Sequence, residues 1–354
     1  MGVRSEFTDS TVLLVGGAGF VGSNLCRALL RQEPKQILIV DNLLSADISN
    51  LPEDPAVRFV RGSIADSRVL SRLPSRIDYV FHLACYHGNQ SSIANPQADH
   101  ENTALVSLML FDHLKDTEGL RKVVYAAAGC AAAEKTFGPV EATPEDAPLS
   151  LHHDSPYSIS KLIGELYANY FFARFGLPVV RARFQNVYGP GEILGAGRWR
   201  GTPHTVWRNV VPTFIWKSMK QEPLPLENGG IATRDFIYVD DIVAGLIACA
   251  CGGKPGEAYN LASGVETSIR ELAEAIDAIT GNPTPAAIRP ARDWDRSGRR
   301  FGATEKAKRE LAFEARVPLR EGLESTVAWT RANAETIEQC IGQHGESMRR
   351  CAAG

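Results

Sequence analysis

The chain has 354 residues, 44% of them hydrophobic, and its 38 Lys and Arg against 41 Asp and Glu give a net charge of −3. Without a basic excess, nucleic acid is not an expected partner. No apolar run approaches the ~20 residues of a membrane span, and the first residues lack the apolar core of a signal peptide. The seven cysteines show no metal-binding spacing, so we expect free thiols, no metal and a cytoplasmic location.

The first element is a β-branched apolar run over 11–15, which leads into the glycine-rich turn GGAGFVG. A helical pattern begins at Ser23. Strand, glycine turn and helix together predict a site where a dinucleotide pyrophosphate meets a helix N-terminus. In this arrangement Gly16 permits the turn, Gly19 lets the backbone approach the phosphates and Gly22 lets helix and strand pack closely. Phe20 and Val21 belong to the same cofactor-binding turn.

A second strand, QILIVD over 36–41, ends in an acid. Asp41 follows Gly22 by 19 positions, about where a ribose-binding acid falls in this kind of fold. A carboxylate accepts hydrogen bonds from ribose hydroxyls and repels a 2′-phosphate. The spacing therefore predicts NAD as the cofactor.

The remaining chain alternates strands and helices up to about residue 190. This alternation predicts an α/β fold with a Rossmann-type, doubly wound parallel sheet. The strands are expected at 12–15, 37–40, 58–60, 78–83, 122–126 and 179–184, and the helices at 23–31, 103–114 and 156–175.

The composition changes at Val187, after which Gly, Pro and Trp are frequent and predict a long loop over 189–212. Ordered loops of this length are often functional. Helices are expected again at 210–219, 239–250, 268–280 and 304–311, before a tail that is helical and then frayed. We therefore predict an NAD-binding domain over 1–186 with a return segment at 231–250, a smaller α/β C-terminal substrate lobe over 187–335, and a helical tail over 336–354.

A Tyr-x-x-x-Lys pair, Tyr157 and Lys161, follows Ser155-Pro156. Side chains four positions apart share one helix face. A neighbouring ammonium favours the phenolate, so we expect Lys161 to lower the pKa of Tyr157 and Tyr157 to act as a base. The alternative is a half-buried tyrosine beside an exposed lysine.

Taken together, these motifs resemble those of the extended short-chain dehydrogenase/reductases, in the sugar-nucleotide epimerase/dehydratase group. The similarity runs from Val12 to about Trp329. It is carried, in order, by GGAGFVG, IVDN, FHLAC, NPQADHEN, SPYSISK, RFQNVYGP and RDFIYVDD.

The resemblance implies an NAD enzyme of carbohydrate biosynthesis that binds a nucleotide-diphosphate sugar. It places Asp41 and Asn42 on the adenosine ribose, Ser63 and Ile64 at the adenine, and Leu83, Ala84 and Lys161 at the nicotinamide side. Ser63 stands where the family usually has Asp. The implied substrate-binding residues are Ser92, Asn186, Arg234, Arg292 and Arg300.

The physical chemistry of arginine agrees, because its planar fork pairs with two diphosphate oxygens. The alternative for Arg234 is a surface ion pair with Asp235. Five arginines lie between 289 and 300, so the assignment of Arg292 and Arg300 is left open between them.

The chain departs from the family after the strand over 122–126. By register, Ala128 takes the place of the usual Ser or Thr that hydrogen-bonds the substrate hydroxyl. Two residues on, Cys130 stands where the 4,6-dehydratases have Glu and the GDP-mannose 3,5-epimerases have a catalytic Cys. Next to a C4 ketone, a thiolate can exchange the proton at C5 or C3. The alternative is that Cys130 is a small buried hydrophobe.

The 3,5-epimerases also use a Lys near 199–201, where this chain has Arg198 and Arg200. Arginine holds its proton too tightly for acid–base work. His204 is a candidate for that role. We assign no catalytic role to His82, His87 or His100, and expect His82 to be structural.

From these observations we expect an NAD-dependent sugar-nucleotide epimerase that works through a transient 4-keto sugar, with Tyr157, Lys161 and Cys130 as catalytic residues. If Cys130 takes part, the change is at C5 or at C3 and C5; if not, the enzyme is a C4-epimerase of the UDP-hexose type. A 4,6-dehydratase and a non-catalytic nucleotide-binding sensor are the further alternatives. Apolar faces on the helices at 103–114 and 156–175 predict a homodimer, unless those faces are buried within the chain.

Overall fold

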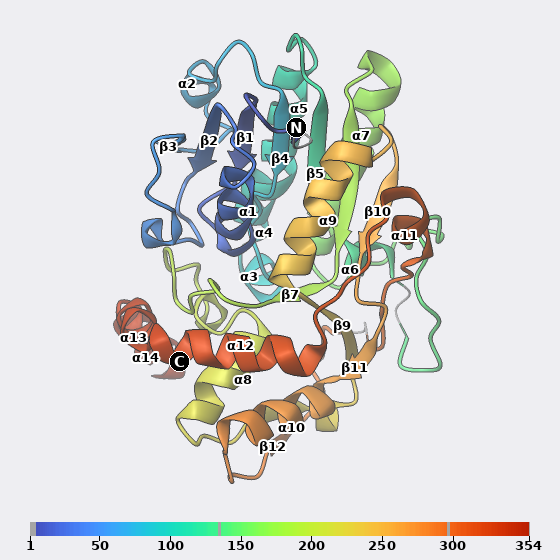
Figure 1. Cartoon of the computed structure of the whole chain (residues 1–354). Helices are drawn as coiled ribbons and strands as arrows, with labels where there is room; N and C mark the ends of the chain where they lie inside the picture. Colours follow the sequence, from blue (N-terminus) through green and yellow to red (C-terminus); the bar gives the residue numbers. More distant parts are fainter. Residues whose placement is uncertain (1–4, 134–135, 296–297, 354) are drawn as a thin grey trace.

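The computed structural model describes residues 5–133, 136–295 and 298–353. Its central layer is a sheet of seven parallel strands in the order β10-β6-β5-β4-β1-β2-β3 (Figure 1). The strands are β1 (Thr11–Val15), β2 (Gln36–Asp41), β3 (Val57–Arg61), β4 (Tyr79–His82), β5 (Lys122–Ala128), β6 (Val179–Phe184) and β10 (Ala258–Leu261). The sequence predicts the first six, and the Rossmann-type α/β fold is confirmed.

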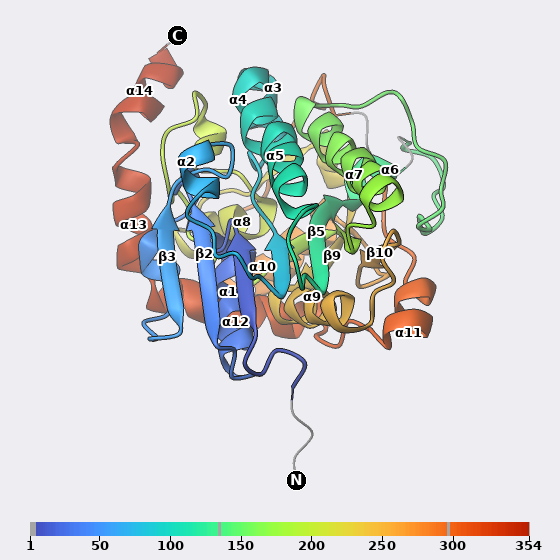
Figure 2. The ribbon, with the colours of Figure 1, turned by 90° about the horizontal axis from the view of Figure 1, so that it is seen from above.

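Helices cover both faces of this sheet, as Figure 2 shows from above. On one face lie α1 (Phe20–Leu30) and α9 (Val239–Gly252), and on the other α5 (Leu105–Leu114) and α7 (Pro156–Phe175). Alternate residues of β1 serve the two sides, since Val12 and Leu14 pack under α1 while Leu13 and Val15 pack under α5. Both faces are buried, so the strands read as continuous apolar runs.

The helix that carries Tyr157 has defined ends. The Ser155 hydroxyl accepts a hydrogen bond from Ser158 N, Pro156 occupies the first turn, and Gly176 ends the helix at φ 71°. These are favourable residues at a helix N-cap, first turn and C-terminus. The start of α7, and so the position of Tyr157, is fixed by local sequence.

A second lobe lies below the sheet in Figure 1. It holds a three-stranded sheet in the order β11-β9-β7 and a two-stranded sheet of β12 and β8. Its strands are β7 (Asn186–Tyr188), β8 (Pro225–Glu227), β9 (Thr233–Tyr238), β11 (Glu266–Ser268) and β12 (Ala287–Arg289), and its helices α8 (Val210–Met219), α10 (Ile269–Thr280) and α12 (Leu319–Ala332). Because α9 packs on the large sheet and β10 belongs to it, the chain returns to the first lobe after β9. The predicted domain limits stay a prediction.

Short helices complete the fold. They are α2 (Ser67–Leu70), α3 (Asn89–Ala94), α4 (Pro96–Asp99), α6 (Gly129–Ala132), α11 (Glu305–Leu311), α13 (Ala334–Gly342) and α14 (Gly345–Ala353), with a π-helical turn at His100–Ala104. The tail is helical through Ala353 and therefore less frayed than expected. His344 anchors it, since its ring Nε2 lies 2.8 Å from Gly195 O. None of the helices described combines the length and apolarity needed to cross a bilayer.

Candidate functional site

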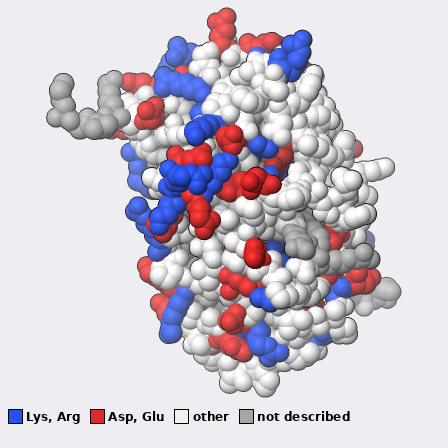
Figure 3. All heavy atoms as spheres, turned by 90° about the vertical axis from the view of Figure 1, so that its right-hand side faces the viewer, with Lys and Arg blue, Asp and Glu red and all other residues white. Residues whose placement is uncertain are grey.

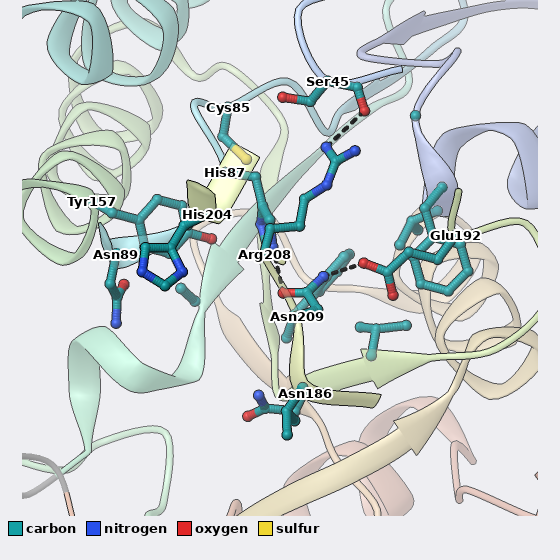
Figure 4. A pocket seen from close by; sticks show the side chains of 18 of the residues that line it. Ser45, Cys85, His87, Asn89, Tyr157, Asn186, Glu192, His204, Arg208 and Asn209 are labelled. Atoms are coloured by element: carbon teal, nitrogen blue, oxygen red, sulfur yellow. Dashed lines mark hydrogen bonds between the residues drawn. The ribbon is translucent and has the colours of Figure 1, made fainter. Parts of the chain in front are cut away.

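One cavity of about 590 Å³ lies at the carboxyl ends of the parallel strands, between the two lobes. Open α/β sheets bind their ligands at this edge. The cavity is lined by the glycine turn after β1, the segments that follow β2 to β6, the loop over 191–211, and the arginines around β9 and β12. Every predicted site residue except Ser92 lines it, and Figure 4 labels two of them, Tyr157 and Asn186.

The glycine turn has the shape that a dinucleotide requires. Gly16 has φ 84°, and a Cβ there would lie 2.5 Å from Ala84 N; at Gly22 it would lie 2.5 Å from Gly16 O. At Gly19 a Cβ would meet only Gly16 O, at 3.4 Å, and no side chain caps α1 there. The uncapped N-terminus faces the cavity and fits a pyrophosphate.

The acid at the end of β2, Asp41, is held by backbone amides. Asp41 accepts hydrogen bonds from Ala18 N at 3.0 Å and Leu43 N at 2.8 Å. Burial raises its pKa, and these backbone donors oppose that effect. Asn42 donates to Asn102 Oδ1 at 3.1 Å, which links the ribose end to the π-helical turn. Ser63, Ile64, Leu83 and Ala84 line the same cavity, as the resemblance implies.

Tyr157 and Lys161 lie together on α7. The Lys161 ammonium lies 6.0 Å from the centre of the Tyr157 ring and donates to Ala126 O at 2.7 Å. Contrary to the expectation of a lowered value, the pKa of Tyr157 lies well above its ordinary value. Burial is the main cause, and the neighbouring Cys85 and Cys130 add to it. In this enclosed pocket burial outweighs the attraction of the ammonium for a phenolate.

The end of β5 shows the departure from the family pattern. Ala128 is buried and lines the cavity, so its methyl group stands where a hydroxyl was expected. Cys130 follows in α6, and its Sγ lies 4.0 Å from Ser158 Oγ. The thiol is half-buried and lines the cavity beside Tyr157, so it is not a fully buried hydrophobe.

Ser92, expected to bind substrate, is placed differently. Its side chain is fully buried and does not line the cavity. The hydroxyl donates to Asn89 O at 2.7 Å and accepts from Tyr157 N at 3.1 Å. Because both bonds are made within the chain, Ser92 positions the start of α7.

Arginines gather at the far end of the cavity. Arg234 is buried, donates to Thr233 O and Gly298 O, and lies 3.4 Å from Asp295 Oδ2. Its pKa is lowered to about 9, first by burial and then by Arg300. Arg292 pairs with Glu227 at 3.1 Å, and Arg300 also lines the cavity. Arg296, one of the five arginines in this segment, lies outside the described residues.

The surface alternative for Arg234 does not hold. Asp235 points to the other side of β9, where it accepts hydrogen bonds from Ser263 N, Gly264 N and Gly302 N. Like-charged, buried guanidinium groups favour an anionic ligand, and a diphosphate meets this need.

Several cavity residues were missed from the sequence. Cys85 and His87 follow β4, and Glu192, Arg208 and Asn209 come from the 189–212 loop (Figure 4). His87 Nε2 lies 2.9 Å from Asn209 Oδ1, and Asn209 donates to Glu192. The position of Cys85 and His87 just after a predicted strand could have indicated them. The 189–212 loop was expected to be functional, but none of Glu192, Arg208 and Asn209 was predicted.

Residues 12–262 match the NAD dependent epimerase/dehydratase family. The chain belongs to this family. Membership confirms the resemblance and NAD as the cofactor. The chain is 30% identical to a dTDP-glucose 4,6-dehydratase of Streptomyces antibioticus, over 91% of this chain and 92% of that protein. It is 28% identical to a UDP-glucose 4-epimerase of Mycolicibacterium smegmatis, over 91% of this chain and 99% of that protein.

One solved structure is more similar in sequence to this chain than these two relatives are. The Bordetella bronchiseptica enzyme WbmF in complex with NAD+ and UDP is 55% identical, covers 98% of this chain and 99% of its own, and has a TM-score of 0.88. The identity is high enough for the site as well as the fold to be compared.

The surface offers no extended field of one charge on the face drawn in Figure 3, where acidic and basic side chains are interspersed. Across the described residues, no three His, Cys, Asp or Glu side chains gather in a way that could hold a metal ion.

Proposed function

We propose that this family member is an NAD-dependent epimerase of a nucleotide sugar, with a UDP-linked substrate as the first candidate. One observation carries the proposal: the glycine turn, the Tyr157–Lys161 pair and the buried arginines line a single cavity. The presence of both NAD+ and UDP in the WbmF complex supports uracil as the base of the substrate.

In the proposed mechanism the arginines hold the diphosphate, so that the hexose lies at Tyr157. NAD, when bound, supplies a reversible acceptor for the hydride at C4. Tyr157 takes the proton of the C4 hydroxyl as the ketone forms, and returns it when the ketone is reduced. Lys161 holds a positive charge beneath the tyrosine, and the mostly apolar walls exclude water from the ketone.

Epimerisation is favoured over 4,6-dehydration because, within the part of the chain that the structure describes, the cavity shows no free carboxylate near Tyr157. Among the described residues its acidic side chains are Asp41, Glu192, Glu227 and Asp295. The first accepts from backbone amides, and the other three are paired with Asn209, Arg292 and Arg234 respectively. The dehydratase reading needs an acid where Cys130 stands.

The test is to incubate the purified protein with UDP-, GDP- and dTDP-linked hexoses and to identify products by NMR. We expect an epimeric nucleotide sugar, with no net production of NADH. Loss of water from the sugar would replace the proposal by a dehydratase. Tight binding without any conversion would support the sensor reading.

A second candidate reaction, epimerisation at C5 or at C3 and C5, rests on Cys130 lying at the cavity wall beside Tyr157. In D₂O a thiol that exchanges the C5 or C3 proton must place deuterium on that carbon. Cys130→Ala should stop this exchange but still permit transient reduction of NAD. If the product carries no carbon-bound deuterium and Cys130→Ala keeps full activity, epimerisation at C5 or C3 is excluded and the C4-epimerase remains.

We further propose a cytoplasmic homodimer. All seven cysteines are free thiols, as a reducing compartment requires. Helix α7 leaves Ile159, Leu166 and Tyr170 between 46% and 54% exposed, a continuous apolar strip at helical spacing.

A further inference from the structure

His87 is positioned as a second proton-transfer group beside Tyr157. The two rings are nearly perpendicular, with centroids 6.0 Å apart. Both side chains line the cavity (Figure 4). A phenol whose pKa is raised by burial gives up its proton only to a nearby acceptor, and Lys161, already an ammonium, cannot accept one.

The hydrogen bonds of His87 fix which ring nitrogen is free. The amide nitrogen of Asn209 donates to Glu192, so the amide oxygen of Asn209 faces His87. An amide oxygen can only accept, and His87 Nε2 therefore carries the hydrogen. The lone pair is left on Nδ1.

That nitrogen is open to the cavity. Within the part of the chain that the structure describes, His87 Nδ1 makes no hydrogen bond. The unpaired Nδ1 atoms of His82 and His204 are inaccessible to solvent, whereas His87 Nδ1 is not among such buried atoms. The backbone at His87 is fixed as well, because Arg200 donates a hydrogen bond to the carbonyl oxygen of His87.

Burial and the neighbouring cations keep the resting His87 ring neutral. Its pKa is lowered to about 4 by burial and by Arg208, Arg200 and Lys161, while its bond to Asn209 opposes the shift. Glu192, whose own pKa is raised to about 7 by burial, lies behind Asn209 and would stabilise an imidazolium once it forms.

We propose that His87 is the proton acceptor behind Tyr157. This inference rests on the proposed function. As the C4–H electron pair leaves with the hydride to NAD, the C4 hydroxyl proton passes to the Tyr157 oxygen, and the phenol proton passes to His87 Nδ1. Reduction of the ketone reverses both transfers, so no proton is gained or lost over a cycle.

The decisive variant is His87→Gln, assayed with the nucleotide sugar that turns over in the panel above. We expect kcat to fall roughly 10²-fold at neutral pH, with KM little changed. The activity that remains should rise steeply with pH without reaching the wild-type rate. The pKa of Tyr157 lies well above its ordinary value, so only a small ionised fraction, which grows with pH, can react without an acceptor. A purely structural role would lower activity equally at every pH. His152→Gln, at an exposed histidine outside the cavity, is the matched control and should behave as wild type.

Chemical rescue provides a second arm. In His87→Ala, added imidazole should restore turnover, and substituted imidazoles should restore it in proportion to their basicity. An unchanged kcat and pH profile in His87→Gln, or a uniform loss without rescue in His87→Ala, would overturn the inference. If wild-type protein converts no nucleotide sugar at all, the proposed function fails instead.

The tautomer can be read without any turnover. In NAD-loaded protein labelled with ¹⁵N-histidine, the signals absent from His87→Gln belong to His87. We expect a protonated Nε2 and a bare Nδ1 at neutral pH, and loss of this preference in Asn209→Leu. A protonated Nδ1 in the wild type would contradict the proposed arrangement.

Discussion

At the scale of single residues, we expect turnover to depend most directly on the Tyr157 hydroxyl. Tyr157→Phe removes one oxygen from a ring that already lines the cavity. We expect kcat to fall by roughly 10²- to 10⁴-fold while the fold and NAD binding are kept. Steady-state kinetics and NAD titration check this. Residual activity close to wild type would assign the proton transfer to another group.

Another residue, His82, should make stability depend on pH. Its side chain is fully buried beside Ser107, and burial lowers its pKa from 6.5 to about 3. The folded state then binds the proton less readily than the unfolded state. Stability from this group is therefore complete above about 6.5 and is lost as the pH falls towards about 3.

The measurement is the free energy of unfolding across that pH range for wild type and His82→Gln. Wild type should lose up to about 1.4 kcal/mol more per pH unit than the variant. Parallel curves would mean that His82 is not the titrating group.

Local sequence was enough to predict the glycine turn, Asp41 and the Tyr157–Lys161 pair, because each depends on spacing within one strand–turn–helix or one helix. It was not enough for the His87–Asn209–Glu192 chain. His87 and Asn209 are 122 positions apart and meet only when the loop after β4 packs against the 189–212 loop. It also failed for the pKa of Tyr157, since burial is a property of the folded pocket.

At the scale of elements, α7 gives a test of assembly. Leu166→Lys places a charge in its apolar strip, where Leu166 is 54% exposed in the single chain. If two α7 helices pack together, burying that charge should raise the dimer dissociation constant at least about tenfold. Light scattering at micromolar concentration should show a wild-type dimer and a dissociating variant.

The control for this test is Ile288→Lys, on β12 of the second lobe, where the side chain is 62% exposed. It adds the same charge at an equally exposed apolar site away from α7. A monomeric wild type would refute the dimer, and equal weakening in both variants would move the interface elsewhere.

Helices with clear capping residues at their ends could be predicted from the sequence. The Ser155-Pro156 start and Gly176 end of α7, and the Ser268–Glu271 capping box of α10, are local features that the sequence displays. The three-residue strands β7, β8, β11 and β12 are not, because pairing across the lobe, rather than their own composition, makes them strands. The order of the tail follows likewise from its contact with Gly195.

At the scale of the whole molecule, the parallel sheet was predictable from the alternation of strands and helices. The path of the chain between the lobes was only partly so. The return segment at 231–250 was expected, but β10 closes the edge of the large sheet through pairing with β6, which no local pattern indicates. Strand β9 precedes this return, and from the second lobe it places Arg234 at the cavity.

Because two lobes enclose one cavity, each ligand should stabilise the folded molecule separately. A ligand present at a hundred times its dissociation constant adds about 2.7 kcal/mol. We expect NAD+ and UDP each to raise Tm, and both together to raise it further. NADP+ should raise it less than NAD+, and Asp41→Ala should narrow that difference, because the carboxylate repels a 2′-phosphate.

The variant Arg234→Ala distinguishes NAD+ binding from UDP binding in the same experiment. Measured against its own ligand-free Tm, this variant should keep the shift with NAD+ and lose most of the shift with UDP. The buried guanidinium lies on β9 of the second lobe, whereas the glycine turn follows β1 of the large sheet. A glucose control without nucleotide should shift neither protein. Equal shifts with NAD+ and NADP+ would contradict the role of Asp41, and an undiminished UDP shift in Arg234→Ala would move the diphosphate away from the arginines.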